Sequence, residues 1–210
     1  MSPAASPPGV PSDAVELDEA IHNRRSVRRF APGDVPPRLV RDLVAAACAA
    51  PAPHHSRPWR FVDVTSAARP RLADAMASDW QADTGDPAPG AAAIDRSRAQ
   101  LVAAPLLLLA CLEMEHAREW PDERRRAAER DMYVQSLGAA LQNLLLAAHG
   151  RGLAGYLKGA PLFCADAIAS ALDLPSGWEP AFLVLLGYPE DGASPPPRET
   201  LDPGDFLASR

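Results

Sequence analysis

Cysteine is scarce in this chain, and its few cysteines stand far apart. Cys48, Cys111 and Cys164 are the only three among 210 residues. An odd number without a Cys-x-x-Cys spacing argues against a disulfide framework and against a structural zinc site. The sequence therefore predicts three reduced cysteines that are buried in the fold, and a cytoplasmic protein.

The chain also lacks the features of a nucleic-acid-binding or membrane protein. Its net charge is −6, and an acidic chain is poorly suited to bind nucleic acid. The longest apolar run, Leu101 to Leu112, is too short and too interrupted to cross a membrane. Residues 1–12 have neither the basic segment nor the apolar core of a signal peptide. They are rich in proline, alanine and serine, which predicts a disordered leader.

Helix and strand patterns predict a single α+β domain over residues 13–210. Apolar periodicity with capping residues indicates helices, and alternating or continuous apolar runs indicate strands. We expect helices at 13–23, 36–50, 67–82, 121–149 and 165–172, and strands at 59–65, 106–111, 153–157 and 182–186. These elements predict one sheet with helices on its faces. Residues 83–90 are expected to form a loop, and the proline-rich residues 188–210 an extended arm.

The longest expected helix, 121–149, carries an apolar seam and a charged start. Its seam has the three- and four-residue spacing of a helix that is buried in a bundle or at a dimer interface. The seam residues are Val134, Leu137, Leu141, Leu144 and Ala148. Residues 122–130 are expected to form a solvated helix face, with an ion pair between Asp122 and Arg126.

Four arginines and a serine are concentrated in one segment, Arg24-Arg25-Ser26-Val27-Arg28-Arg29-Phe30. Guanidinium groups offer planar, bidentate donors, which is the geometry that a phosphate monoester requires. Taken alone, the cluster is equally compatible with solvated charges near a helix end.

A rigid, proline-punctuated segment follows at Ala50–Phe61 and leads directly into a strand. It contains the pair His54-His55, which invites a metal-binding interpretation. Adjacent residues of an extended loop point to opposite sides, and no third ligand is spaced to join the two histidines. We therefore expect no metal site.

Together, these two segments resemble the paired cofactor motifs of the nitroreductase family, whose members bind FMN. Family members carry an RRSxRxF-like segment, followed by a motif of the form Ala-Pro-Ser-x-x-Asn-x-Gln-Pro-Trp-x-Phe. The register matches here without a gap from Ala50 to Phe61. The resemblance implies a nitroreductase-like α/β sandwich with a mainly antiparallel central sheet. It also implies a homodimer, with FMN at the dimer interface and an extended C-terminal arm.

The resemblance further implies which residues bind FMN and substrate. It also implies that FMN carries the redox chemistry, with NADH or NADPH as a possible electron donor. In the family, the arginine segment holds the phosphate and ribityl chain, the proline loop lies beside the flavin, and the glycine after the long helix lies beneath its ring. The implied FMN-binding residues are Arg24, Arg25, Ser26, Val27, Arg28, Ala52, Pro53, His55, Arg57, Gly159, Ala160 and Arg198. The implied substrate-binding residues are His54, His55, Arg57 and Trp80.

Two of these positions depart from the family pattern. His55 replaces the usual asparagine and Arg57 the usual glutamine. Both side chains still donate hydrogen bonds, but the pocket becomes more basic. A cation there would stabilise an anionic reduced flavin or face an anionic substrate.

Runs outside the flavin motifs resemble one branch of the family, the C-terminal reductase domain of the FbiB family of coenzyme F420 biosynthesis. These runs are 121–130, 162–164, 171–175 and 178–180, together with the paired histidines; the likeness is weakest over 81–103. The resemblance implies reduction of dehydro-F420-0 to F420-0, with hydride passing from reduced FMN to an enolpyruvyl double bond. The substrate would be an anionic deazaflavin precursor. Because only a short leader precedes the first expected helix, a separate F420 glutamate ligase would be the partner.

Three alternatives stay open at the level of sequence. A broad-specificity NAD(P)H-dependent reductase of nitro compounds, quinones or enones would share every flavin contact. A non-catalytic flavin- or deazaflavin-binding protein would need the same pocket without turnover. An oxygen-dependent flavin-fragmenting enzyme of related fold would need a closed oxygen pocket.

Overall fold

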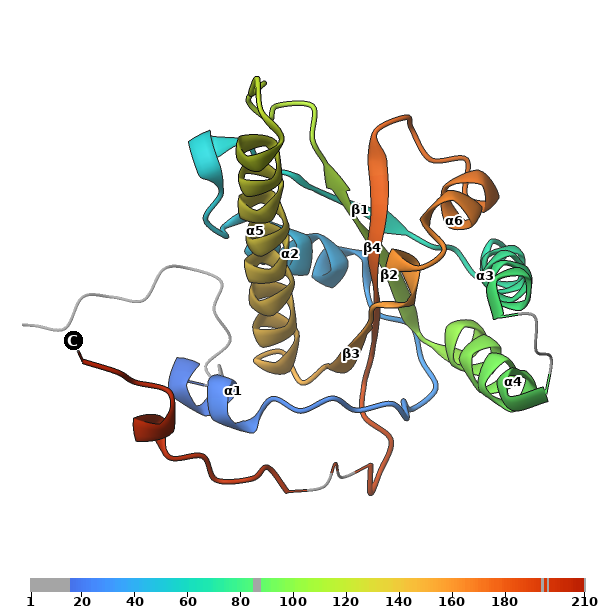
Figure 1. The fold of residues 1–210 in the computed structure, drawn as a ribbon. Coiled ribbons are helices and arrows are strands. Elements are labelled where there is room, and N and C mark those ends of the chain that lie inside the picture. The colour runs from blue at the N-terminus through green and yellow to red at the C-terminus, as the bar shows by residue number, and fades with distance from the viewer. Residues whose placement is uncertain (1–15, 85–87, 194, 196, 210) are drawn as a thin grey trace, which may run out of the picture.

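A four-stranded antiparallel sheet in the order β1-β2-β4-β3 forms the centre of the molecule (Figure 1). The computed structural model describes residues 16–84, 88–193, 195 and 197–209. The strands are β1 (Trp59–Asp63), β2 (Leu106–Glu113), β3 (Ala154–Lys158) and β4 (Trp178–Gly187). The predicted α+β fold with an antiparallel sheet is thereby confirmed.

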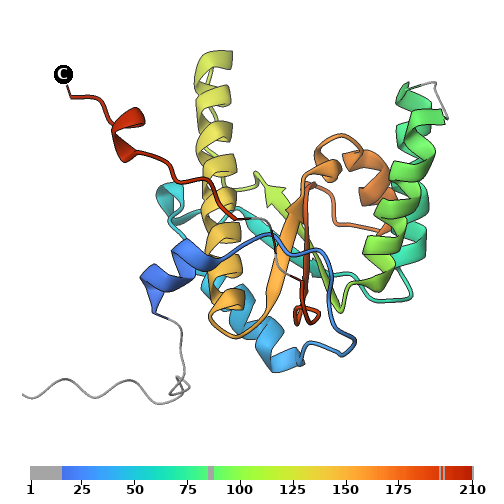
Figure 2. The same ribbon diagram turned by 90° about the horizontal axis from the view of Figure 1, so that it is seen from below.

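Helices cover both faces of this sheet (Figures 1 and 2). On one face lie α2 (Pro37–Cys48) and α5 (Glu123–His149), and α1 (Leu17–Asn23) packs against α5. On the other face lie α3 (Arg69–Thr84), α4 (Ala88–Ala103) and α6 (Ala165–Ala171). Single 3-10 turns follow at Pro53–His55 (η1), Ala160–Leu162 (η2) and Pro203–Asp205 (η3).

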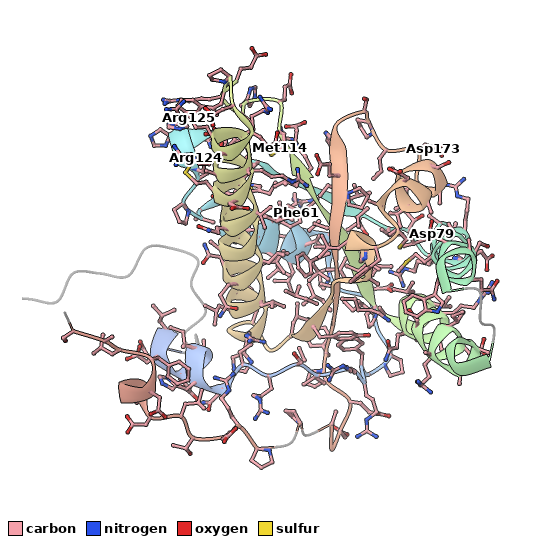
Figure 3. All side chains as sticks on the ribbon, in the orientation of Figure 1. Phe61, Asp79, Met114, Arg124, Arg125 and Asp173 are labelled. Carbon is pink, nitrogen blue, oxygen red and sulfur yellow. The ribbon has the colours of Figure 1, made fainter. Side chains whose placement is uncertain are left out.

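The central strand β2 contributes to two hydrophobic cores because successive side chains of a strand point to opposite faces. Leu106, Leu108 and Ala110 pack towards α2 and α5, where Phe61 and Met114 also lie (Figure 3). Leu107 and Leu109 pack towards α3, α4 and α6. All five β2 residues are buried. The continuous apolar run of this strand correctly predicted burial on both faces.

The long helix α5 begins one residue after a capping aspartate, Asp122, whose Oδ1 accepts the Arg125 N–H at 3.0 Å. The predicted Asp122–Arg126 pair is wrong, because the Asp122 carboxylate at the cap faces Arg125, which it pairs with at 2.7 Å. Arg126 pairs with Glu123 instead. Most of the apolar seam is buried against the sheet, but Val134 is 47% exposed.

Helix α4 is the main element that the sequence pattern did not indicate. The segment is rich in alanine and has few large apolar residues, so its helical periodicity is weak. Because α3 extends to Thr84 and α4 starts at Ala88, the loop expected over 83–90 is shorter than predicted. Residues 85–87, the predicted leader and the start of the first helix at Asp13 lie outside the described residues.

The cysteines and the arm differ in part from expectation. Cys111 and Cys164 are buried, and burial raises the pKa of the Cys111 thiol to about 12. Cys48 is exposed, since it is the last residue of α2 and lies one position beyond Ala47, which is buried together with Leu43, so its predicted burial is wrong. The arm after β4 contains only η3 as regular structure among its described residues. Within the described part of the chain, every helix is too short or too polar to cross a bilayer.

We predict that Gly155→Ala destabilises the protein by about 2 kcal/mol, a typical cost of overpacking. A Cβ at Gly155 would lie 2.6 Å from the Leu185 carbonyl oxygen and would also clash with the Leu186 side chain. The Leu185 carbonyl belongs to β4, which is paired on both sides, so its backbone cannot move aside without a large cost in free energy. The matched control is Gly150→Ala, where the Cβ would meet only Leu146 O at 3.5 Å. Chemical denaturation measures both; equal stabilities would contradict this close packing.

Candidate functional site

The arginine segment runs along the open edge of β3, where Ser26 forms a parallel bridge with Gly155. The Val27 N–H donates to Gly155 O at 3.4 Å, and the Ala31 N–H donates to Tyr188 O at 2.9 Å. These contacts make residues 24–30 a partial extra strand. They fix the positions of Arg24, Arg25 and Arg28 at the edge of the sheet.

Three arginines, Arg24, Arg25 and Arg198, gather at this edge. Arg198 of the C-terminal arm donates from Nη2 to the Arg24 carbonyl oxygen at 3.0 Å. Burial, followed by the charges of Arg198 and Arg25, lowers the pKa of Arg24. Within the described residues, none of the three forms an ion pair with a carboxylate. Two residues that the family resemblance assigned to FMN binding, and that are far apart in the sequence, are therefore in contact in the fold.

The Arg24 Nε atom is buried and has no hydrogen-bond partner among the residues that the structure describes. An unmade hydrogen bond of this kind is costly, and charged donors cost most. The adjoining cavity has a volume of about 360 Å³, and its lining includes Arg24, Arg25, Val27, Gly155 and His149. A phosphate monoester would supply both the missing acceptor and the missing negative charge.

Further along β3, Arg28 and Lys158 form a second cationic group. The Arg28 guanidinium lies 5.2 Å from the centre of the Tyr156 ring, and the buried Tyr156 hydroxyl has no hydrogen-bond partner in the described part of the chain. Lys158 Nζ donates to Ser97 Oγ at 2.8 Å and to Gln100 Oε1 at 3.0 Å. Burial, and then the Arg28 charge, lowers the pKa of Lys158. Lys158 is the only lysine in the sequence, a signal that sequence reasoning did not use.

The second predicted segment, with Ala52, Pro53, His55 and Arg57, lies beside the N-terminal half of α5 (Figure 1). Three of its non-glycine residues have left-handed backbone conformations: His54 at φ 54°, His55 at φ 57° and Arg57 at φ 50°. The two histidines are therefore not in an extended loop, and the argument that they point to opposite sides fails. Such strain costs about 1–3 kcal/mol per residue and is concentrated at functional sites.

Glu129 of α5 is the nearest buried acid to this strained loop. Its carboxylate accepts the Arg118 N–H at 3.1 Å and the Trp120 Nε1–H at 3.2 Å. Burial alone would raise the pKa of Glu129, but these hydrogen bonds and the charges of His54 and Arg118 together lower it. The prediction of a solvated face over 122–130 is wrong here, because Glu129 lies on the buried stripe with Tyr133 and Leu137. That four-residue spacing could have revealed it.

The two predicted halves of the FMN site are far apart within one chain. The His54 loop adjoins α5 at Glu129, whereas the arginine cavity adjoins α5 at Leu145 and His149. A helix rises 1.5 Å per residue, so Glu129 and Leu145 are about 24 Å apart along the axis. One copy of the chain does not bring both halves to one ligand.

A second cavity, of about 260 Å³, lies between α3, α4 and η2. It brings together Trp80, which the family resemblance assigned to substrate binding, and Ala160, which it assigned to FMN binding. Most of the remaining lining is apolar and includes Met76, Ile94 and Phe163. Gly159 immediately precedes Ala160 in the sequence.

We predict that Glu129→Gln lowers the melting temperature at neutral pH by several degrees. The pKa of Glu129 is lower in the folded protein than the unfolded value of about 4.3. Its contribution to stability is therefore complete above that value and is lost as the pH falls through the folded pKa. The difference from wild type should shrink below about pH 4.

Thermal unfolding across pH measures this effect, with Glu119→Gln as the control. Glu119 is exposed and lies in the same loop as Trp120. A Glu129→Gln deficit that stays constant down to pH 2.5 would mean that the carboxylate charge is not what stabilises the loop.

The comparisons place this fold among known proteins. A family model described as "Nitroreductase family" matches residues 21–188. Iodotyrosine deiodinase of Haliscomenobacter hydrossis is 28% identical over 206 residues, covering 91% of this chain and 87% of that protein. NADH dehydrogenase of Thermus thermophilus is 27% identical over 214 residues, covering 90% of this chain and 94% of that protein.

Solved structures share the fold at lower identity. A nitroreductase-like family protein from Bacillus cereus superposes with a TM-score of 0.75 at 20% identity, covering 96% of this chain and 99% of that one. The FMN-dependent nitroreductase NfnB from Mycobacterium smegmatis, in complex with NADPH, gives a TM-score of 0.69 at 20% identity. That match covers 92% of this chain and 97% of that one.

Proposed function

Because this chain belongs to the nitroreductase family of oxidoreductases, we propose that it is an FMN-dependent reductase that converts dehydro-F420-0 to F420-0. The observation that carries the cofactor assignment is the group of Arg24, Arg25 and Arg198, which has no acidic partner among the described residues, together with the buried Arg24 Nε, which has no acceptor among them. Charge and hydrogen-bonding capacity at this cavity both fit the phosphate of FMN.

The remaining residues of the β3 edge fit the rest of an elongated flavin nucleotide. Ser26 and Val27 lie beside Gly155, and Arg28 lies over Tyr156, one residue further along the strand. Gly159 and Ala160 follow the end of β3 and would lie beneath the ring. FMN supplies two-electron chemistry, taking hydride from a donor such as NADH or NADPH and delivering it to the substrate.

We propose that the working form is a homodimer, because the two halves of the site lie about 24 Å apart along α5 in one copy. A second copy would bring its Ala52–Arg57 loop to the flavin held by the first. Exposed apolar side chains supply a surface for this contact on α1, on α5 and on the arm. They are Leu17, Ile21, Met132, Val134, Leu201, Phe206 and Leu207.

The substrate proposal rests on the FbiB-like runs and on the basic character of the loop. His55 and Arg57 would face the phosphate and carboxylate of the enolpyruvyl group. The double bond gains one hydride and one solvent proton, so the product is two hydrogens heavier. The chain's own contribution is to bind and orient this group, and a separate F420 glutamate ligase would act on the product.

The second candidate is a broad-specificity NAD(P)H-dependent reductase of nitro compounds, quinones or enones. The apolar cavity beside Ala160 favours it, since uncharged aromatic acceptors fit such a lining.

We predict that Arg25→Ala weakens FMN binding roughly tenfold to a hundredfold and leaves the fold intact. The lost interaction is a charge-assisted contact to phosphate, worth about 1.5–3 kcal/mol. Arg29→Ala is the matched control, because Arg29 is exposed and pairs with Glu190 instead of facing the cavity. Fluorescence titration of the apoprotein with FMN gives both affinities. Equal affinities would remove the phosphate-site assignment.

We predict that the FMN-loaded protein, reduced stoichiometrically without oxygen, is reoxidised in a single turnover by dehydro-F420-0. Flavin absorbance follows the reoxidation, and mass spectrometry should find a product two hydrogens heavier. A quinone and a nitroaromatic compound serve as comparison acceptors. Rapid reoxidation by those acceptors alone would replace the deazaflavin proposal with the broad-specificity one. Reduced flavin that reacts with none of them would favour a binding protein.

A further inference from the structure

The cavity between α3, α4 and η2 has an open, aromatic rim. Trp80 is 49% exposed and Phe163 is 76% exposed, although both line it. Helices α3 and α4 lie side by side on one flank of the molecule (Figures 1 and 2), and residues of both line the cavity. Leu101 and Ala73 close its floor and are buried. Large apolar side chains held open around a cavity are typical of a ligand site.

This cavity is distinct from the arginine cavity but is connected to it by β3. The two share no lining residue among those that the structure describes. Ala154 and Gly155, at the start of β3, line the arginine cavity, whereas Ala160, just after β3 ends, lines the α3–α4 cavity. A flavin nucleotide with its phosphate at Arg24 and its ring at Ala160 would therefore end beside the second cavity.

The chemistry of the lining selects a flat, uncharged group. Trp80 and Phe163 offer ring faces, and Met76 offers a polarisable thioether, all of which favour an aromatic partner. The charged residues in the lining are Asp79 and Arg98, and Arg98 pairs with Asp74. Asp79, marked on α3 in Figure 3, would repel a phosphate or carboxylate. Ser97 is held by Lys158, which ties α4 to the strand that leads to Ala160.

We infer that the α3–α4 cavity binds the planar aromatic ring system of the substrate, a deazaflavin tricycle. The anionic tail stays outside it, beside the flavin ring. This inference rests on the proposed function and adds the part of the protein that recognises the ring. It assigns substrate recognition to α3 and α4; the end of α3 and all of α4 lie within residues 81–103, where the likeness to the FbiB family is weakest.

The test is binding of 5-deazariboflavin, which carries the ring but neither phosphate nor enolpyruvyl tail, to the FMN-loaded protein. Equilibrium dialysis gives the affinity, and flavin absorbance gives the FMN content of each variant. Ala77→Phe, which fills the cavity from α3, should weaken 5-deazariboflavin binding at least tenfold at unchanged FMN content. Ala82→Phe is the matched control on the same helix, since Ala82 is exposed and outside the lining, and should change affinity less than twofold.

Trp80→Ala provides an independent variant that adds no bulk, and it should also weaken binding by removing a ring face. Wild-type protein that does not bind the probe, or Ala77→Phe and Trp80→Ala variants that bind it normally, would overturn the ring site. Turnover of dehydro-F420-0 separates the two proposals. Normal turnover with an unchanged KM in both variants would overturn the ring site alone. Absent turnover, with cavity-dependent binding of the probe, would overturn the proposed reaction alone.

Discussion

The pairing of β2 with β4, buried on both faces, is the constraint on which the rest of this structure depends. Leu107, Leu109, Leu183 and Leu185 are fully buried on the face towards α3, α4 and α6, and their neighbours fill the opposite face. Such a sheet must be covered by helices on both sides, since neither face can meet water. Polar chemistry is therefore confined to its edges and to the loops beyond its ends. The outer edge of β3 is where residues 24–28 dock, which explains why the arginines gather there.

The electrostatics of that edge favour ligand binding over stability. The chain carries a net charge of −6, yet Arg24, Arg25 and Arg198 lie together and form no ion pair with an acid among the described residues. The same segment does have an arginine with an acidic partner, since Arg29, four residues after Arg25, pairs with Glu190. Bringing like charges together and partly burying one of them lowers stability unless an anion binds. Glu129 shows the opposite arrangement, because two hydrogen bonds and the charges of His54 and Arg118 together outweigh the effect of burial and keep this carboxylate charged.

Local patterns predicted most of the fold but only part of the site. β2 and α5 were predictable because a continuous apolar run and a capped, periodic helix are determined by neighbouring residues. α4 was not, since alanine-rich sequence carries little periodicity.

The pairing of Arg198 with Arg24 follows from chain topology, and only the family resemblance indicated it. The left-handed backbone at His54, His55 and Arg57 had no sequence signal, because glycine usually marks such positions. Glu129 was detectable from its spacing to Tyr133 but resembled its charged neighbours.

The positions of the cationic and apolar regions limit which molecules this protein can use. The cationic loop around Arg57 and the arginine cavity lie at opposite ends of α5, so a shared ligand requires a second copy of the chain. The apolar cavity lies on the other face of the sheet, beyond the end of β3, and its acidic residue Asp79 disfavours anions. A small uncharged acceptor would use only the cavity, and a small anion would use only the loop. A substrate that combines a flat ring with a charged tail would use both the cavity and the loop. For this reason, the proposed deazaflavin precursor accounts for more of this structure than a simple quinone or nitroaromatic compound does.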